Sequence, residues 1–160
     1  MALGDNTLRS AAGNSQRGRN PYMVETTLNW ATALSDKGTA LAAADVIPVI
    51  AVAKGTMILN AGIEVDTATD GSTFTVDLGT GVDADVFVDG FDATSAAAVV
   101  AQNPAAYQPV MAVADDNIDV TIATLSGGAV TSGKFRVWAV LMDCTEMGDT
   151  AANEVARDNA

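Results

Sequence analysis

The stretch that decides the fold is KFRVWAVLMDC, residues 134–144, because its large side chains alternate between two faces. One face is apolar and consists of Phe135, Val137, Ala139 and Leu141. The other face has an arginine among apolar residues and consists of Arg136, Trp138, Val140 and Met142. Successive side chains of a β-strand point to opposite faces, so this period of two predicts a strand. Because both faces are apolar, we expect the strand at the centre of a sheet or against a neighbouring subunit.

The same period of two recurs in earlier segments that turn signals separate from one another. These segments are VETTLNWATAL (24–34), STFTVDLG (72–79), QPVMAVA (108–114) and NIDVTIATL (117–125). The run 45–71 fits two or three further strands, with Pro48 at an edge or a bulge and a turn at Lys54-Gly55. The Asp70-Gly71 pair stands between alternating runs and predicts a β-hairpin.

This organisation gives about eight short strands and no strand–helix alternation, which is the pattern of an all-β sandwich. We expect an antiparallel β-sandwich that is jelly-roll-like, although the pattern does not give the strand order. The sandwich domain is expected at residues 23–144, between an extended basic arm at 1–22 and a C-terminal tail at 145–160.

The chain is long enough to bury a core without cross-links, since a domain of this size buries roughly 70 % of its unfolded surface. The lone Cys144 cannot form an internal disulfide. Trp30 and Trp138 are expected to anchor the core, because buried aromatic rings dominate core energetics. The alanine-rich segment 93–107 fits either a short helix or a loop packed on the sheet.

The aspartate-rich stretch DLGTGVDADVFVDGFDA, residues 77–93, raises the question of a metal site. Aspartates spaced two apart can present oxygen ligands to a hard cation, as they do in a calcium-binding loop. Counted from Asp83, however, the fifth and sixth positions are Phe87 and Val88, and the twelfth is not a glutamate. The stretch therefore fails the calcium-loop pattern, and we expect no metal.

Aspartate and glycine mark turns, so the stretch is interpreted as turn, strand and turn. The expected bounds are a turn at 79–83, a strand at 85–89 and a second turn at 90–93. A divalent cation that bridges subunits at Asp83 and Asp85 stays open as an alternative. Glu64 and Asp66 repeat the same spacing, and we interpret them as part of a solvated strand face.

The composition excludes several classes of function. The chain has no histidine, which removes the commonest general base and metal ligand, so we expect no enzyme and no cofactor. A formal net charge of −12 repels nucleic acid phosphates and anionic membranes. No apolar run approaches the ~20 residues that cross a bilayer, and the start lacks a secretion leader. We therefore expect a soluble chain without nucleic acid, membrane or small-molecule partners.

Positive charge gathers at the N-terminus, although the chain as a whole is acidic. The first twenty residues carry Arg9, Arg17 and Arg19 beside Asp5 alone, so this arm is formally +2 and the remainder −14. Arginine forms forked hydrogen bonds to carboxylates, which suits docking on an acidic surface. Tyr22 follows as an aromatic anchor. An ordinary frayed terminus is the alternative interpretation.

Beyond these patterns, one region resembles a small protein family of tailed bacteriophages. The features that carry the resemblance are the run VIPVIAVAKGTMILNAGIEVDTA followed by TFTVDLGTGVDADVFVDGFDA, within residues 46–93, and the polar start MALGDNTLRSAAGNSQRGRNPY. The family it is similar to comprises virion structural proteins that decorate capsids, also called cement proteins. The resemblance implies a protein that is made in the host cytoplasm and binds the outside of the major capsid lattice, without catalytic residues.

Three classes of function follow from these observations. The first is a virion structural protein at the capsid surface whose partner is the major capsid protein. A capsid lattice has threefold positions, so we expect this protein to be a homotrimer. The alternatives are a receptor- or carbohydrate-binding module of a phage fibre or spike, and an enzyme with a carboxylate-bound metal.

Overall fold

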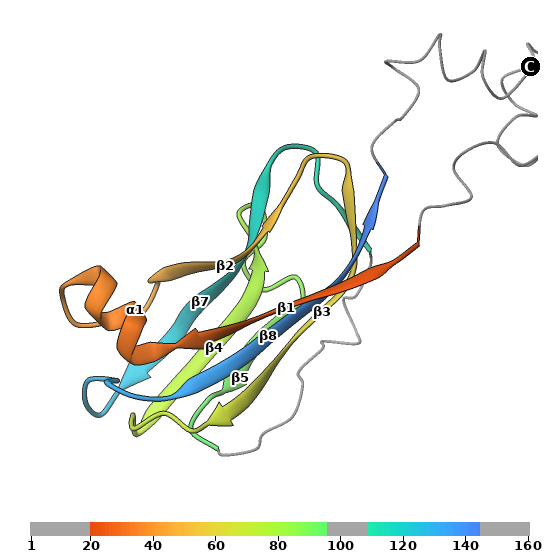
Figure 1. Cartoon of the computed structure of the whole chain (residues 1–160). Coiled ribbons are helices and arrows are strands. Elements are labelled where there is room, and N and C mark those ends of the chain that lie inside the picture. Colours follow the sequence, from red (N-terminus) through yellow and green to blue (C-terminus); the bar gives the residue numbers. More distant parts are fainter. Residues whose placement is uncertain (1–19, 96–108, 145–160) are drawn as a thin grey trace, which may run out of the picture.

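The computed structural model describes residues 20–95 and 109–144, which form two four-stranded antiparallel sheets packed face to face (Figure 1). The elements are β1 (Tyr22–Asn29), α1 (Trp30–Lys37), β2 (Val46–Val52), β3 (Thr56–Thr67), β4 (Thr73–Thr80), β5 (Val88–Asp92), β6 (Val110–Met111), β7 (Asp116–Ser126) and β8 (Lys134–Asp143). Sheet A has the strand order β1-β8-β3-β6, and sheet B has the order β2-β7-β4-β5. Within these described ranges, no helix is long and apolar enough to cross a bilayer.

The strand order is that of a jelly roll. The first strand pairs with the last, the second with the seventh, the third with the sixth and the fourth with the fifth, as in one long hairpin. That hairpin folds over when β3 pairs with β8 and β4 pairs with β7. The all-β, jelly-roll-like prediction is therefore confirmed. The strand at 134–143 lies between β1 and β3, so its predicted central position is also confirmed.

The predicted hairpin at Asp70-Gly71 is wrong, because the strands on either side of it belong to different sheets. β3 lies in sheet A and β4 in sheet B, so the chain crosses between the sheets at this turn. The carboxylate of Asp70 accepts hydrogen bonds from the backbone N–H groups of Thr131, at 2.8 Å, and Ser132, at 3.1 Å. The aspartate thus joins this connection to the loop that precedes β8.

The segment 24–34, predicted as one strand, is a strand followed by a helix. Asn29 caps the helix, because its side-chain oxygen accepts a hydrogen bond of 3.0 Å from the N–H of Ala31. Gly38 ends the helix in the left-handed conformation, at φ 71°. The apolar alternation of β1 continues into α1, so the predicted strand extended past the true end of β1 at Asn29.

The strand predicted at 85–89 is displaced toward the C-terminus, since β5 spans Val88–Asp92. β5 continues through a bulge at Gly90, which has φ 65° and lies where the pairing between β4 and β5 changes register. The N–H of Gly90 donates a 2.7 Å hydrogen bond to the Asp77 carboxylate. Gly90 therefore lies within the strand and does not begin a turn.

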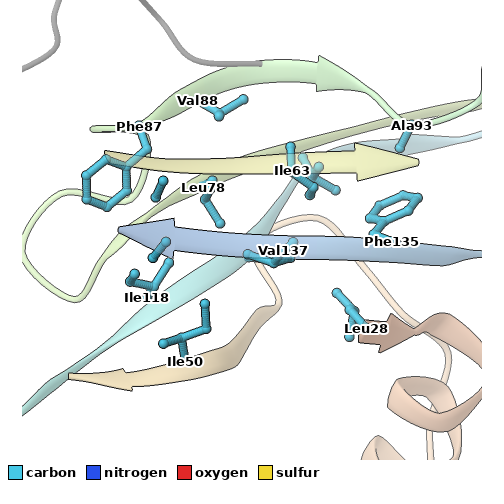
Figure 2. Close-up of a cluster of buried hydrophobic side chains, with 14 of the residues drawn as sticks. Leu28, Ile50, Ile63, Leu78, Phe87, Val88, Ala93, Ile118, Phe135 and Val137 are labelled. Atoms are coloured by element: carbon cyan, nitrogen blue, oxygen red, sulfur yellow. The ribbon is translucent and has the colours of Figure 1, made fainter. Parts of the chain in front are cut away.

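The core fills the space between the inner faces of the two sheets, where side chains from both sheets point toward one another (Figure 2). Trp30 is fully buried at the start of α1, as predicted. Its ring meets Phe74 of sheet B and Phe135 of sheet A edge to face, with centroids 4.8 and 5.2 Å apart. Trp138 was also expected in the core, and this is wrong. In β8, Trp138 alternates with the core residues Val137 and Ala139, so its side chain lies on the outer face of sheet A and is partly exposed.

We predict that Asp70 and Thr131 stabilise the fold as a coupled pair. Hydrogen bonds from the Thr131 hydroxyl and N–H lower the pKa of Asp70 to about 2. A carboxyl whose pKa is lower in the folded state stabilises above its unfolded pKa of ~3.9, and the contribution is lost as the pH falls toward 2. Asp70→Asn and Thr131→Val should each lower the free energy of unfolding at pH 7, and the double variant should lose less than their sum.

The measurement is urea unfolding of the four proteins at pH 7 and at pH 2.5. The difference between wild type and Asp70→Asn should shrink at the lower pH, where the wild-type carboxyl begins to protonate. Fully additive losses, or a difference that does not change with pH, would contradict this role for Asp70.

Candidate partner-binding surfaces

The structure describes one of the four residues that the sequence assigned to partner binding. Tyr22 is the first residue of β1 and is 46 % exposed. Arg9, Arg17 and Arg19 lie outside the described residues. In Figure 1 the start of β1 and the end of β8 lie at the same end of the sandwich, away from α1. We call this the open end.

The acidic loop between β4 and β5, residues 81–87, brings two carboxylates together. The hydrogen bond that protonated Asp85 donates to Asp83, and then the negative charge of Asp83, raise the pKa of Asp85. Two neighbouring carboxylates disfavour each other's ionised form. Within the described residues, no group of three or more acidic, cysteine or histidine side chains could hold a metal ion. The cation at Asp83 and Asp85 remains an alternative from the sequence.

Glu64 forms an ion pair across the sheet. Arg136 of β8 donates two hydrogen bonds to the Glu64 carboxylate on β3, the one from Nε being 2.9 Å long, and its guanidinium also lies 3.6 Å from Glu25 on β1. The hydrogen bond to Glu64, and then its negative charge, raise the pKa of Arg136. These three side chains therefore connect three adjacent strands on the outer face of sheet A. The period-two pattern could not show that Glu64 lies opposite Arg136.

The acidic loop folds back onto the end of β4 at Gly79. A Cβ atom on Gly79 would lie 2.1 Å from the carbonyl oxygen of Asp83 and 2.2 Å from the carbonyl carbon of Ala84. Thr80 closes the turn, because its N–H donates a 2.8 Å hydrogen bond to the Asp83 carbonyl. Only glycine permits this close approach of the two backbone segments.

The open end also contains an apolar pocket that the sequence did not predict. Its volume is about 310 Å³, and its lining includes Val52, Ile58, Val110, Met111, Ala112 and Val113. Val82 and Val113 line it while remaining 88 % and 76 % exposed. Residues of five strands and two loops meet here, and single-segment periodicity cannot show such a meeting.

The outer faces of the two sheets differ in chemistry. Strand pairing places four methionines together on the outer face of sheet A, since Met57 is paired with both Met142 and Met111, and Met23 is paired with Val140. On the outer face of sheet B, pairing places Thr121 and Asp119 of β7 beside Asp77 and Gly79 of β4. The outer face of sheet A is therefore rich in methionine near the open end, beyond the charged side chains of Arg136, Glu64 and Glu25, whereas the paired positions on sheet B are polar and Asp119 among them is buried.

Comparison with known proteins finds similarity in fold and none in sequence families. No family model and no curated protein matches the chain. A chain of the Cyanophage Pam1 capsid asymmetric unit is similar, with a TM-score of 0.60 and 16 % identity, over 88 % of this chain and 97 % of that one. A chain of the capsid of Ralstonia phage GP4 has a TM-score of 0.56 and 16 % identity, over 79 % of this chain and 86 % of its own. At this identity, the likeness shows a shared fold.

We predict that Gly79→Ala will destabilise the protein by about 1–3 kcal/mol, the usual cost of forcing an atom into a filled space. The added methyl would meet backbone atoms of the acidic loop, which cannot rotate away. The control is Gly90→Asn, because Gly90 has open space around it and asparagine tolerates a positive φ. Urea unfolding compares the two. A loss for Gly79→Ala no larger than that for Gly90→Asn would contradict the close approach.

Proposed function

We propose that this chain is a non-enzymatic structural protein of a phage virion, which binds and stabilises the outer surface of the capsid as a decoration protein. The observation that carries the proposal is the fold shared with a chain of the Pam1 capsid asymmetric unit over 97 % of that chain's length. The resemblance of residues 46–93 to capsid decoration proteins supports it independently. The proposed location is the capsid surface, and the proposed partner is the major capsid protein.

The basic arm is the proposed anchor on the capsid. A chain with a net charge of −12 is repelled by an acidic shell, whereas Arg9, Arg17 and Arg19 are attracted to it. Tyr22 supports this orientation, because it is half exposed where β1 begins at the open end. An arm that leaves the sandwich at Tyr22 brings the open end toward the surface on which it docks.

The pocket at the open end suits the same orientation. Its apolar lining and exposed rim valines would bury an apolar side chain of the capsid protein, which stabilises a contact at about 25 cal/mol per Å² of apolar area. Electrostatic attraction by the arm and apolar burial at the pocket then act at the same end of the sandwich. The body joins its neighbours as a homotrimer, which matches the threefold positions of a lattice.

We predict that replacing Arg9, Arg17 and Arg19 with glutamine will weaken binding to capsids at least tenfold at 0.1 M salt. The variant removes the charges that are proposed to draw the arm to the shell. The matched control replaces the same residues with lysine, which keeps the charge, and should bind more tightly than the glutamine variant. Co-sedimentation with capsids that lack the protein measures binding, and circular dichroism checks the fold.

Wild-type binding should also weaken as salt is raised, because exposed charges are screened within ~10 Å at 0.1 M. A protein without residues 1–21 that folds and binds capsids as tightly as the full chain would show that the arm is only a frayed terminus.

We predict that Val113→Asp will weaken capsid binding, because it places a charge at the rim of the apolar pocket. Val113 is 76 % exposed, so the substitution should leave the core intact. The matched control is Val46→Asp, which changes a valine that is 56 % exposed on β2 of sheet B. Co-sedimentation should fall for Val113→Asp alone. Equal binding by both variants would exclude the pocket from the contact.

A further inference from the structure

The apolar outer face of sheet A extends across all four strands near the open end. Its apolar residues are Met23, Met57, Met111, Met142, Val140 and Trp138, with Asn60 opposite Val140 among them, and we call it the methionine face. Met23 is 57 % exposed and Met111 is 40 % exposed, and these two lie at opposite edges of the sheet. Contiguous exposed apolar surface on a protein marks an interaction site, and methionine is over-used at such surfaces.

Trp138 lies against the sheet. A Cβ atom on Gly62 would lie 2.5 Å from Cζ2 of the Trp138 indole, so the ring occupies the space above this glycine. Gly62 is opposite Trp138 in the pairing of β3 with β8. The indole therefore covers the backbone of the neighbouring strand, and its partly exposed ring extends the apolar surface.

The charged residues beside this face neutralise one another in part. Arg136, two residues from Trp138 along β8, forms an ion pair with Glu64 and lies 3.6 Å from Glu25, which is paired with Trp138 at the edge of the methionine face. On sheet B, Asp77 is half-buried and accepts a hydrogen bond from Gly90, and Asp119 is buried. Burial raises the pKa of Asp119, with the nearby Asp116 charge as the smaller cause.

We propose that the methionine face binds a second copy of this chain. Copies that each carry a net charge of −12 repel one another, and their contact is least unfavourable where both surfaces are apolar. The methionine face offers such a surface near the open end. Rings close by rotational symmetry, so three copies can each turn this face toward one axis.

The edges of the sheets agree with this assignment. In sheet B, the edge strand β2 contains Pro48 and a register shift, and the edge strand β5 contains the bulge at Gly90. Such features prevent pairing with another chain. In sheet A, β1 pairs in an unbroken register from Tyr22 to Asn29 and contains neither proline nor glycine. The edge that could accept another chain thus adjoins the methionine face at Met23.

The proposal rests on the homotrimer of the proposed function, and its test does not require capsids. Wild-type mass in solution, measured by light scattering at micromolar concentration, should be three times the 16.3 kDa of one chain. Met23→Asp should weaken self-association at least tenfold, because each copy would bury an unpaired charge. The matched control is Val46→Asp, since Val46 is 56 % exposed and also lies on an edge strand. Met111→Asp tests the opposite edge of the face.

A wild-type mass of one chain, or an unchanged mass for folded Met23→Asp and Met111→Asp, would overturn the proposal. Salt distinguishes it from capsid anchoring, since screening should favour association of like-charged copies and weaken binding through the arm. If Met23→Asp and Met111→Asp dissociate and Val46→Asp does not, the proposed interface is supported, even where wild-type protein fails to bind capsids. If wild-type protein is a monomer that still binds capsids, the proposed interface is contradicted and the proposed anchor is supported.

Discussion

Antiparallel pairing of β1 with β8 joins the first and last strands of the sandwich over eight residue pairs, from Tyr22 with Leu141 to Asn29 with Lys134. Because of this pairing, the start of β1 and the end of β8 lie at one end of the molecule, where the pocket also lies (Figure 1). The other end holds α1, with the buried indole of Trp30 between Phe74 and Phe135. Segments at the open end can engage a partner without disturbing that aromatic cluster.

A sandwich gives each strand one face toward the core and one outside, so the outer residues are free to differ between the sheets. The outer faces of the two sheets differ in the residues they carry. Met57, Met111 and Met142 adjoin one another on sheet A, whereas Asp77 and Asp119 lie on sheet B. Neither set contributes to the inner faces, so the fold does not require the difference. The proposed interface between copies would account for the methionine face.

The sequence predicted the fold class and the central strand because both depend on periodicity within single segments. It placed Asp70-Gly71 in a hairpin because turn chemistry specifies a reversal of the chain and not the sheet that receives the next strand. It extended β1 beyond Asn29 because the apolar alternation continues into α1, where a cap overrides it. Trp138 was wrongly predicted to lie in the core, since a central strand can carry a large ring on either face.

The candidate surfaces were harder to predict than the fold. Tyr22 was chosen from its residue type and its place beside the basic arm, and the structure shows it half exposed. The pocket and the methionine face join side chains from strands distant in sequence, and only the strand order brings them together. Met23 and Met142 lie far apart along the chain, yet their strands are neighbours in sheet A. Without the jelly-roll order, the methionines are isolated positions in separate strands.

The two proposed contacts make different demands on the same chain, and their combination resolves a conflict between solubility and assembly. A net charge of −12 keeps assembled copies soluble, while their contact is confined to an apolar face. An arm that holds copies on one lattice raises their effective concentration, so a contact that already forms in solution is strengthened there. Methionine suits such a contact, because its flexible side chain adapts to a neighbour without a preformed fit. The charge of the body and the apolar face of sheet A thus favour assembly where the arm has already bound.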